Sequence, residues 1–265
     1  MRKILSVVLL TLSFYVVNAQ SDEQFYQPTK ELKPIEFSNT EEITIPVAND
    51  TITAILLKPK SKPKATILFF HGTGGNVSTY QFMVSPLVED QFQVVMVDFR
   101  GYGKSTGKPT HLNIAEDGQV FFDAMLKRDD TKNTPIILYG ASMGSQIATL
   151  LAKNNQNRIK ALILDGALSS FTDIAAFYAP QYKQMIEKNY VSPYLAKENI
   201  KSLNAIKKLL IHSKEDKEIP YDQGLIVFYN APEPKQFFEY KGSHLMSIVQ
   251  DKEQVIKAIN NLLHQ

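Results

Sequence analysis

The sequence predicts a single α/β domain in which a mostly parallel, twisted sheet is flanked by helices. Two patterns in the 265 residues support this prediction. Continuous apolar runs of strand length are typical of strands that are buried on both faces. Segments with helical periodicity separate these runs, and strands that alternate with helices indicate right-handed βαβ units. A 44% hydrophobic composition is enough for one sizeable core.

The expected elements follow in order along the chain. Residues 41–47 and 51–58 are strand-like on either side of Asn49-Asp50, which predicts an antiparallel hairpin. The polar, irregular residues 20–40 are expected to form a strap ahead of it. Buried strands are expected at residues 65–70, 93–97, 135–139, 160–164, 208–211 and 236–240. Helices are expected at residues 79–89, 113–127, 143–153, 221–229 and 251–263.

The N-terminus has the three-part layout of a secretory signal peptide. Arg2-Lys3 is basic, Ile4–Val17 is mostly apolar, and Ala19 is a small residue at the cleavage position. We expect residues 1–19 to be removed, residues 20–265 to form the domain, and the protein to be exported to the periplasm or secreted. The alternative is an uncleaved anchor, but the apolar run is shorter than the roughly 20 residues that span a bilayer. The later apolar runs have strand length, so no transmembrane span is expected in the mature chain.

Charge and cysteine content exclude several classes of function. The chain has 29 basic and 27 acidic residues, and losing Arg2 and Lys3 with the leader leaves 27 of each. This balance gives no electrostatic basis for binding nucleic acid. Without cysteine, a thiol nucleophile, disulfides and Cys-ligated zinc are excluded. The histidines lack the spacing of metal ligands, so neither a metal nor a cofactor is expected.

One motif carries the chemistry. Gly140-Ala141-Ser142-Met143-Gly144 is a G-x-S-x-G sequence that follows an expected strand and opens an expected helix. This strand–turn–helix setting is that of a nucleophile elbow, which predicts Ser142 as a nucleophile. The N–H of Met143, at the start of the helix, is expected to face developing negative charge. The alternative is a glycine-rich turn with an incidental serine.

A serine needs a base to take its proton and an acid to orient that base. Of the five histidines, His244 lies just after the last strand and before the last helix, where a base belongs in this chain order. Asp216 directly follows the strand at residues 208–211 and is the expected acid, with Glu215 and Glu218 as local competitors. Asp165, at the end of an earlier strand, is the alternative acid.

Two loops follow the first parallel strands. His71-Gly72-Thr73-Gly74-Gly75-Asn76 is glycine-rich, so its backbone N–H groups can approach a substrate oxygen closely. A phosphate cradle is the competing interpretation, but the loop lacks the spacing of either phosphate-binding motif. Residues 98–105 are expected to form a structural turn in which Arg100 supports the loops.

These motifs, in this order, resemble the α/β-hydrolase superfamily, and most closely its serine aminopeptidase-like and Bem46-like branch with a small cap. The resemblance covers roughly residues 40–263. It implies that Ser142 is the nucleophile, Asp216 the acid and His244 the base, with the backbones of Thr73 and Met143 as the oxyanion hole. The sequence departs from the pattern of this family at Ser213, where relatives often have glycine. A serine nucleophile argues against the haloalkane dehalogenase and epoxide hydrolase branches, which use aspartate there.

The expected function is therefore hydrolysis of a small-molecule carboxylic ester through an acyl-enzyme. A peptidase or amidase, or a thioesterase or monoacylglycerol lipase, would use the same residues. The alternative from another class is a catalytically silent, ligand-binding hydrolase fold. Residues 171–204 are too long for a simple crossover and predict an inserted cap. Its aromatic residues either line an acyl pocket or dock the cap: Phe171, Phe177, Tyr178, Tyr182, Tyr190 and Tyr194.

Overall fold

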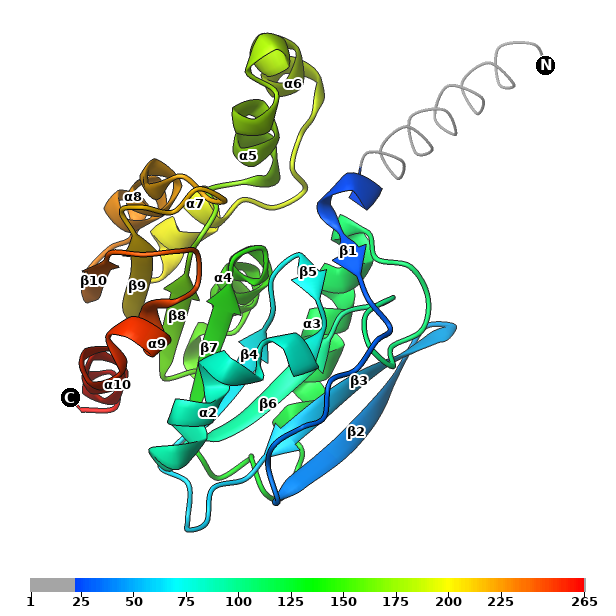
Figure 1. Cartoon of the computed structure of the whole chain (residues 1–265), viewed down its shortest axis with the longest axis vertical. Helices are drawn as coiled ribbons and strands as arrows, with labels where there is room; N and C mark the ends of the chain where they lie inside the picture. The colour runs from blue at the N-terminus through cyan, green and yellow to red at the C-terminus, as the bar shows by residue number, and fades with distance from the viewer. Residues whose placement is uncertain (1–21, 265) are drawn as a thin grey trace.

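A computed structural model describes residues 22–264, and the expected leader lies outside them. Its central sheet has eight strands in the order β10-β9-β8-β7-β4-β6-β3-β2 (Figure 1). All neighbouring pairs are parallel except β2–β3 and β3–β6. The strands are β2 (Thr40–Val47), β3 (Asp50–Leu57), β4 (Thr66–Phe70), β6 (Gln93–Asp98), β7 (Ile136–Ala141), β8 (Ala161–Asp165), β9 (Lys207–Ser213) and β10 (Lys235–Tyr240).

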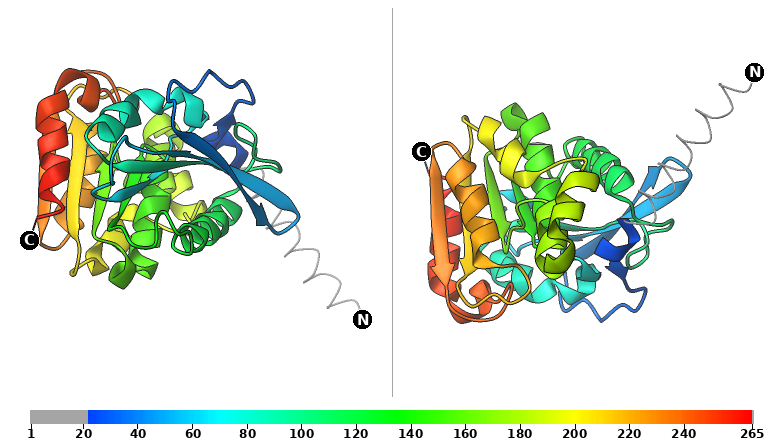
Figure 2. Two further views of the ribbon diagram at one scale, coloured as in Figure 1. Left: turned by 90° about the horizontal axis from the view of Figure 1, so that it is seen from below. Right: turned by 90° about the horizontal axis from the view of Figure 1, so that it is seen from above.

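Helices cover both faces of this sheet (Figure 2). Their contacts form two groups, α3, α4, α7 and α8 on one face and α2, α9 and α10 on the other. The side chains of β4 alternate accordingly: Leu68 and Phe70 join one core cluster, and Ile67 and Phe69 join the other. The helices are α2 (Gln81–Glu89), α3 (His111–Met125), α4 (Gly144–Asn154), α7 (Ala196–Asn199), α8 (Tyr221–Asn230), α9 (Ser247–Gln250) and α10 (Lys252–Asn261).

The predicted fold is confirmed, and the differences lie in its short elements. The hairpin and each expected strand and long helix are present within a few residues. Helix α3 begins two residues earlier than expected, because Thr110 caps it in a reciprocal exchange with Asn113. Between β8 and β9 the chain forms α5 (Phe171–Tyr178), α6 (Lys183–Asn189) and α7, and the first two stand above the strand ends in Figure 1.

The strap is more ordered than its composition indicates. It contains a short helix, η1 (Glu23–Phe25), and a two-residue strand, β1 (Gln27–Pro28). Strand β1 pairs in parallel with β5 (Gly74–Gly75), outside the main sheet. The first segment of the described chain is thereby held against the loop that follows β4 (Figure 1).

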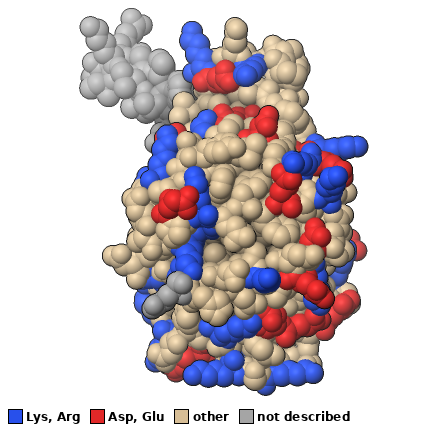
Figure 3. All heavy atoms as spheres, turned by 90° about the vertical axis from the view of Figure 1, so that its left-hand side faces the viewer, with Lys and Arg blue, Asp and Glu red and all other residues tan. Residues whose placement is uncertain are grey.

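The surface mixes charges of both signs. On the face that Figure 3 shows, Lys and Arg side chains lie among Asp and Glu side chains. Within residues 22–264, every helix is too short or too polar to cross a bilayer.

The loop after β6 is held by a buried charge pair. Arg100 donates to both carboxylate oxygens of Asp117, at 2.6 and 2.8 Å, and to Asp50 at 3.1 Å. The Asp117 side chain is only 3% exposed. Replacing arginine would therefore leave a buried carboxylate without its partner, which costs more than losing a surface pair.

We expect Arg100→Met to lower the free energy of unfolding by about 3 kcal/mol, because Asp117 stays buried without its cation. The matched control is Arg158→Met, which breaks an exposed pair with Asp123. It should cost less than about 1 kcal/mol. Urea unfolding at pH 7 measures both, and equal losses in the two variants would contradict a supporting role for Arg100.

Candidate active site

Ser142 occupies a strained turn between β7 and α4. Its backbone φ is 52°, in the left-handed region, which costs a non-glycine residue on the order of 1–3 kcal/mol. The flanking glycines make the turn possible. A Cβ on Gly140 would lie 2.6 Å from the Cα of Ser145, and one on Gly144 would collide with the carbonyl oxygen of Phe70. The turn therefore presents Ser142 at the carboxyl edge of the sheet.

His244 and Asp216 meet at the same edge. The Nδ1 atom of His244 lies 2.6 Å from Oδ2 of Asp216. The other carboxylate oxygen, Oδ1, accepts hydrogen bonds from the N–H groups of Glu218 and Ile219, each at 2.9 Å. Burial alone would raise the pKa of Asp216, but the imidazole of His244 and the N–H of Ile219 hold the pKa below its usual 3.8. The carboxylate is thus kept ionised toward the imidazole.

Gly166 makes room for the imidazole. This residue follows β8, and a Cβ there would lie 2.5 Å from Cε1 of His244. Its backbone φ of 60° also favours glycine. Any larger residue at position 166 would push the imidazole away from its place beside Asp216.

The side chain of Ser213 links the loop that carries Asp216 to the loop that carries His244. Its hydroxyl donates to the carbonyl oxygen of Gly242, next to the loop of His244. The same hydroxyl accepts from the N–H of Glu215, in the loop of Asp216, at 3.0 Å. A glycine at position 213 could make neither bond, so Ser213 couples the positions of acid and base.

Asp165, the alternative acid, faces other partners. Its Oδ2 accepts hydrogen bonds from the hydroxyls of Tyr139 and Ser247, at 2.9 and 3.0 Å. The side chain is fully buried, and this burial raises the pKa of Asp165 to about 6. Among the two candidates, Asp216 is the carboxylate that contacts His244.

Three other histidines are buried, each within 4 Å of an aspartate oxygen. Burial lowers the pKa of His71 to about 4 and of His111 to about 3, so both are neutral at pH 7. His212 lies 3.5 Å from Oδ2 of Asp216 and 3.0 Å from the carbonyl oxygen of Ile219. Sequence reasoning did not single out His212 as a neighbour of the acid. The sequence feature that could have indicated this contact is the position of His212 at the end of β9, four residues before Asp216.

Two backbone N–H groups are free to bind a substrate oxygen. Thr73 lies in the loop after β4, and Met143 precedes α4. Among residues 22–264, neither N–H donates a hydrogen bond to the protein. Both residues line the same cavity as Ser142. Thr73 and Met143 thus meet two conditions of the predicted oxyanion hole, an N–H without a protein acceptor in the described chain and a place on the cavity of Ser142.

That cavity has a volume of about 760 Å³ and a mostly apolar lining. Within the described residues that line it, Glu218 is the one acidic side chain. The cap aromatics divide between the two expected roles. Phe171, Tyr178 and Tyr190 line the cavity, whereas Tyr194 is buried and docks the cap by donating to the carbonyl oxygen of His111 at 2.8 Å. The two remaining aromatic side chains are exposed: Phe177 and Tyr182.

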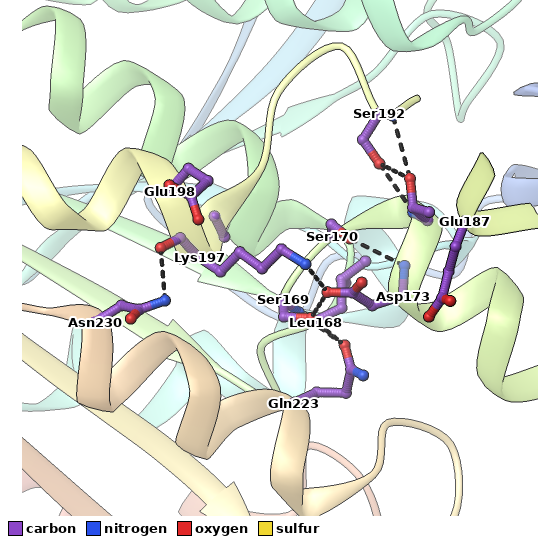
Figure 4. Close-up of polar contacts among 12 residues, drawn as sticks. Leu168, Ser169, Ser170, Asp173, Glu187, Ser192, Lys197, Glu198, Gln223 and Asn230 are labelled. Atoms are coloured by element: carbon purple, nitrogen blue, oxygen red, sulfur yellow. Dashed lines mark hydrogen bonds and ion pairs between the residues drawn. The ribbon is translucent and has the colours of Figure 1, made fainter. Parts of the chain in front are cut away.

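Polar contacts anchor the base of the cap (Figure 4). Lys197 of α7 contacts Asp173 of α5 at 2.6 Å. Ser169, just before α5, donates to Gln223 of α8 at 2.7 Å. The cap wall of the cavity is thereby tied to the core, since α8 packs on β9. Among residues 22–264, no three His, Asp or Glu side chains are grouped to hold a metal ion.

The chain is similar to several known proteins. A family model described as serine aminopeptidase, S33, matches residues 61–202. The uncharacterized protein YfhR of Escherichia coli (strain K12) is 33% identical over 180 residues, which cover 67% of this chain and 62% of that protein. Protein bem46 of Schizosaccharomyces pombe is 27% identical over 172 residues, or 64% and 56% of the two chains. The matches thus span about three fifths of the length of these relatives.

Solved structures share the architecture. The Pyrococcus furiosus esterase Pf2001 superposes with a TM-score of 0.71 at 15% identity, covering 89% of this chain and 98% of that one. Est1E from Butyrivibrio proteoclasticus, solved with ferulic acid bound, has a TM-score of 0.70 at 18% identity, covering 84% and 100%. At these identities the likeness shows a common fold.

The carboxyl groups of Asp165 and Asp216 should have opposite effects on how the stability of the protein depends on pH. With its pKa of about 6, folded Asp165 keeps a proton that the unfolded chain releases near pH 4. Stability should therefore fall as the pH rises from about 4 to 6, by on the order of 3 kcal/mol. Asp216 has a lowered pKa, so its contribution is present above pH 4 and is lost as the pH falls below that value.

We expect the difference in unfolding free energy between the wild-type protein and Asp165→Asn to change between pH 4 and 6. The difference for Asp216→Asn should change only below about pH 4. Urea unfolding from pH 3 to 8 measures both. The assignment of partners is wrong if Asp216→Asn removes the slope between pH 4 and 6.

Proposed function

Because the chain belongs to the serine aminopeptidase S33 family of α/β hydrolases, we propose that it is a serine hydrolase that cleaves carboxylic esters. The observation that carries the proposal is the 2.6 Å contact between His244 and Asp216. Ser142 is held at positive φ and lines the same cavity as His244. Nucleophile, base and orienting acid are the three groups that acyl transfer to serine requires.

The proposed reaction has two halves. The Oγ atom of Ser142 attacks the ester carbonyl carbon while Nε2 of His244 takes the hydroxyl proton. Asp216 accepts from Nδ1–H, which sets the tautomer and stabilises the imidazolium. The N–H groups of Thr73 and Met143 receive the oxyanion. The imidazolium then protonates the leaving alcohol. In the second half His244 deprotonates a water that attacks the acyl carbon, and the imidazolium returns that proton to Oγ of Ser142 as the acid leaves.

The lining of the cavity favours an apolar acyl group. Next to the candidate oxyanion donors it presents mostly aliphatic and aromatic side chains. Burying a methylene of the substrate there is worth roughly 0.8 kcal/mol. We therefore propose a small ester or other acyl compound as the substrate.

A second candidate is an aminopeptidase, and Glu218 favours it. Glu218, two residues after Asp216 in the sequence, lines the cavity. The backbone carbonyl oxygen of Glu218 accepts a hydrogen bond from the hydroxyl of Tyr178 at 2.7 Å. A free amino terminus bound at Glu218 would gain a charge-assisted hydrogen bond. Glu218 is largely exposed, however, so water competes with that ammonium group and weakens the preference.

We expect a fluorophosphonate probe to label the purified protein, and Ser142→Ala to abolish labelling, because only an activated serine attacks phosphorus. The matched control is Ser145→Ala, a serine one turn away in α4 whose hydroxyl is buried and without a hydrogen-bond partner in the described chain. Gel fluorescence reads the labelling. Persistent labelling of Ser142→Ala would refute the nucleophile.

The same probe distinguishes the two acids. The labelling rate should fall by roughly 10³-fold or more in Asp216→Asn, since the imidazole loses its orienting partner. In Asp165→Asn the rate should stay within about tenfold, because this side chain contacts Tyr139 and Ser247 instead. The reverse result would move the acid to Asp165.

A substrate panel separates esterase from aminopeptidase. We expect kcat/KM for p-nitrophenyl esters to exceed that for aminoacyl p-nitroanilides by roughly 100-fold, or about 2.7 kcal/mol. Glu218→Gln should leave the ratio unchanged if the enzyme is an esterase. Aminoacyl substrates that are cleaved faster than esters, and that lose this advantage in Glu218→Gln, would establish the aminopeptidase instead.

A further inference from the structure

The strap supplies part of the cavity through its first described residues, 22–30. Its residues Gln24, Phe25 and Gln27 lie on the lining together with Ser142 and His244. In Figures 1 and 2 it runs beside the cap and next to the loop that carries β5. No step of the proposed reaction uses it, so its place in the site needs a separate explanation.

Hydrogen bonds fix the strap to the loop of Thr73. The N–H of Gln27 donates to the carbonyl oxygen of Thr73, and the N–H of Thr29 donates to that of Gly75, both at 3.2 Å. The hydroxyl of Thr73 donates back to the carbonyl oxygen of Phe25 at 3.0 Å. The backbone around Phe25 therefore has a set position relative to a candidate oxyanion donor.

His111 fixes the strap to α3 and to the cap. Its Nδ1 lies 2.6 Å from the hydroxyl of Tyr26, in the strap, and its Nε2 lies 2.6 Å from the hydroxyl of Tyr190, in the cap. Its backbone N–H donates to Asp22 at 3.0 Å. The imidazole also stacks on Phe171 at 3.8 Å between ring centroids. Strap and cap are thus joined through one buried side chain.

Phe25 forms an aromatic wall with two cap residues. Its ring lies edge-on to Phe171 at 5.2 Å and is stacked with Tyr190 at 5.8 Å. All three residues line the cavity, and Phe25 is half-buried. Because its backbone is held by Thr73 and its ring by the cap, Phe25 cannot swing aside without breaking these contacts.

We infer that Phe25 is a specificity-determining residue that limits the length of the acyl chain the cavity accepts. This inference rests on the proposed function, since it concerns the acyl group of the same reaction. Removing the phenyl ring enlarges the cavity without changing the nucleophile, the base, the acid or the two oxyanion donors. Each further methylene that a longer chain buries in the new space is worth about fourfold in kcat/KM.

The test measures kcat/KM on p-nitrophenyl esters from acetate to laurate. In Phe25→Ala we expect the preferred chain to lengthen by roughly two to four methylenes, with acetate hydrolysis within about threefold of the wild-type rate. In Phe25→Trp, which narrows the cavity, the preferred chain should shorten. The matched control is Tyr182→Ala, an exposed cap aromatic outside the lining, and its profile should stay that of the wild-type protein.

Fluorophosphonate labelling of Ser142 separates this inference from the proposed function. Normal labelling with an unchanged chain-length profile in both Phe25 variants would overturn the role of Phe25 and leave the esterase intact. An equal loss at every chain length would also overturn it, because that is the result of a merely structural residue. An unmodified protein that neither labels nor cleaves any ester would overturn both.

Discussion

The close approach of α4 to the end of β4 is the constraint on which the site depends. Gly144 packs against the carbonyl oxygen of Phe70 with no space for a side chain, and Gly140 packs against α4 from the other side. This contact holds Ser142 in the left-handed region at a cost that the packed core offsets. It also brings the N–H of Met143 beside the loop of Thr73. One backbone contact therefore helps to place both the proposed nucleophile and the proposed oxyanion donors.

The proposed acid and base, Asp216 and His244, depend on a second contact, between the loops after β9 and β10. These strands pair in parallel, so their carboxyl ends lie side by side, and the Ser213 hydroxyl links the loops that follow. Without the Ser213 hydroxyl, both of its hydrogen bonds to these loops would be lost. Asp216 and His244 are thus held both by the contact between them and by the hydrogen bonds of Ser213 to their loops.

The features that could be predicted from the sequence are those that short, local patterns of residues indicate. The Ser142 turn and the strands are local patterns, and the ends of parallel strands share one edge, so Asp216 and His244 were predictable partners. Contacts between distant segments leave no such pattern. His111 follows a polar stretch and looks like a loop residue, yet it meets Tyr26 from 85 positions away. The Thr110–Asn113 capping box is a sequence signal that places His111 on a helix, but the sequence analysis began that helix at residue 113.

In the proposed reaction, the reacting side chains lie on turns at the edge of the main sheet, whereas part of the cavity wall comes from the strap and the cap, which lie outside that sheet. His111 joins strap and cap while contacting neither Ser142 nor His244 by any hydrogen bond in the described chain. A change in the strap can therefore reshape the cavity while the strained turn and its glycine contacts stay as they are. Conversely, Gly140, Gly144 and Gly166 have no such freedom, because a single added carbon at any of them meets backbone or imidazole.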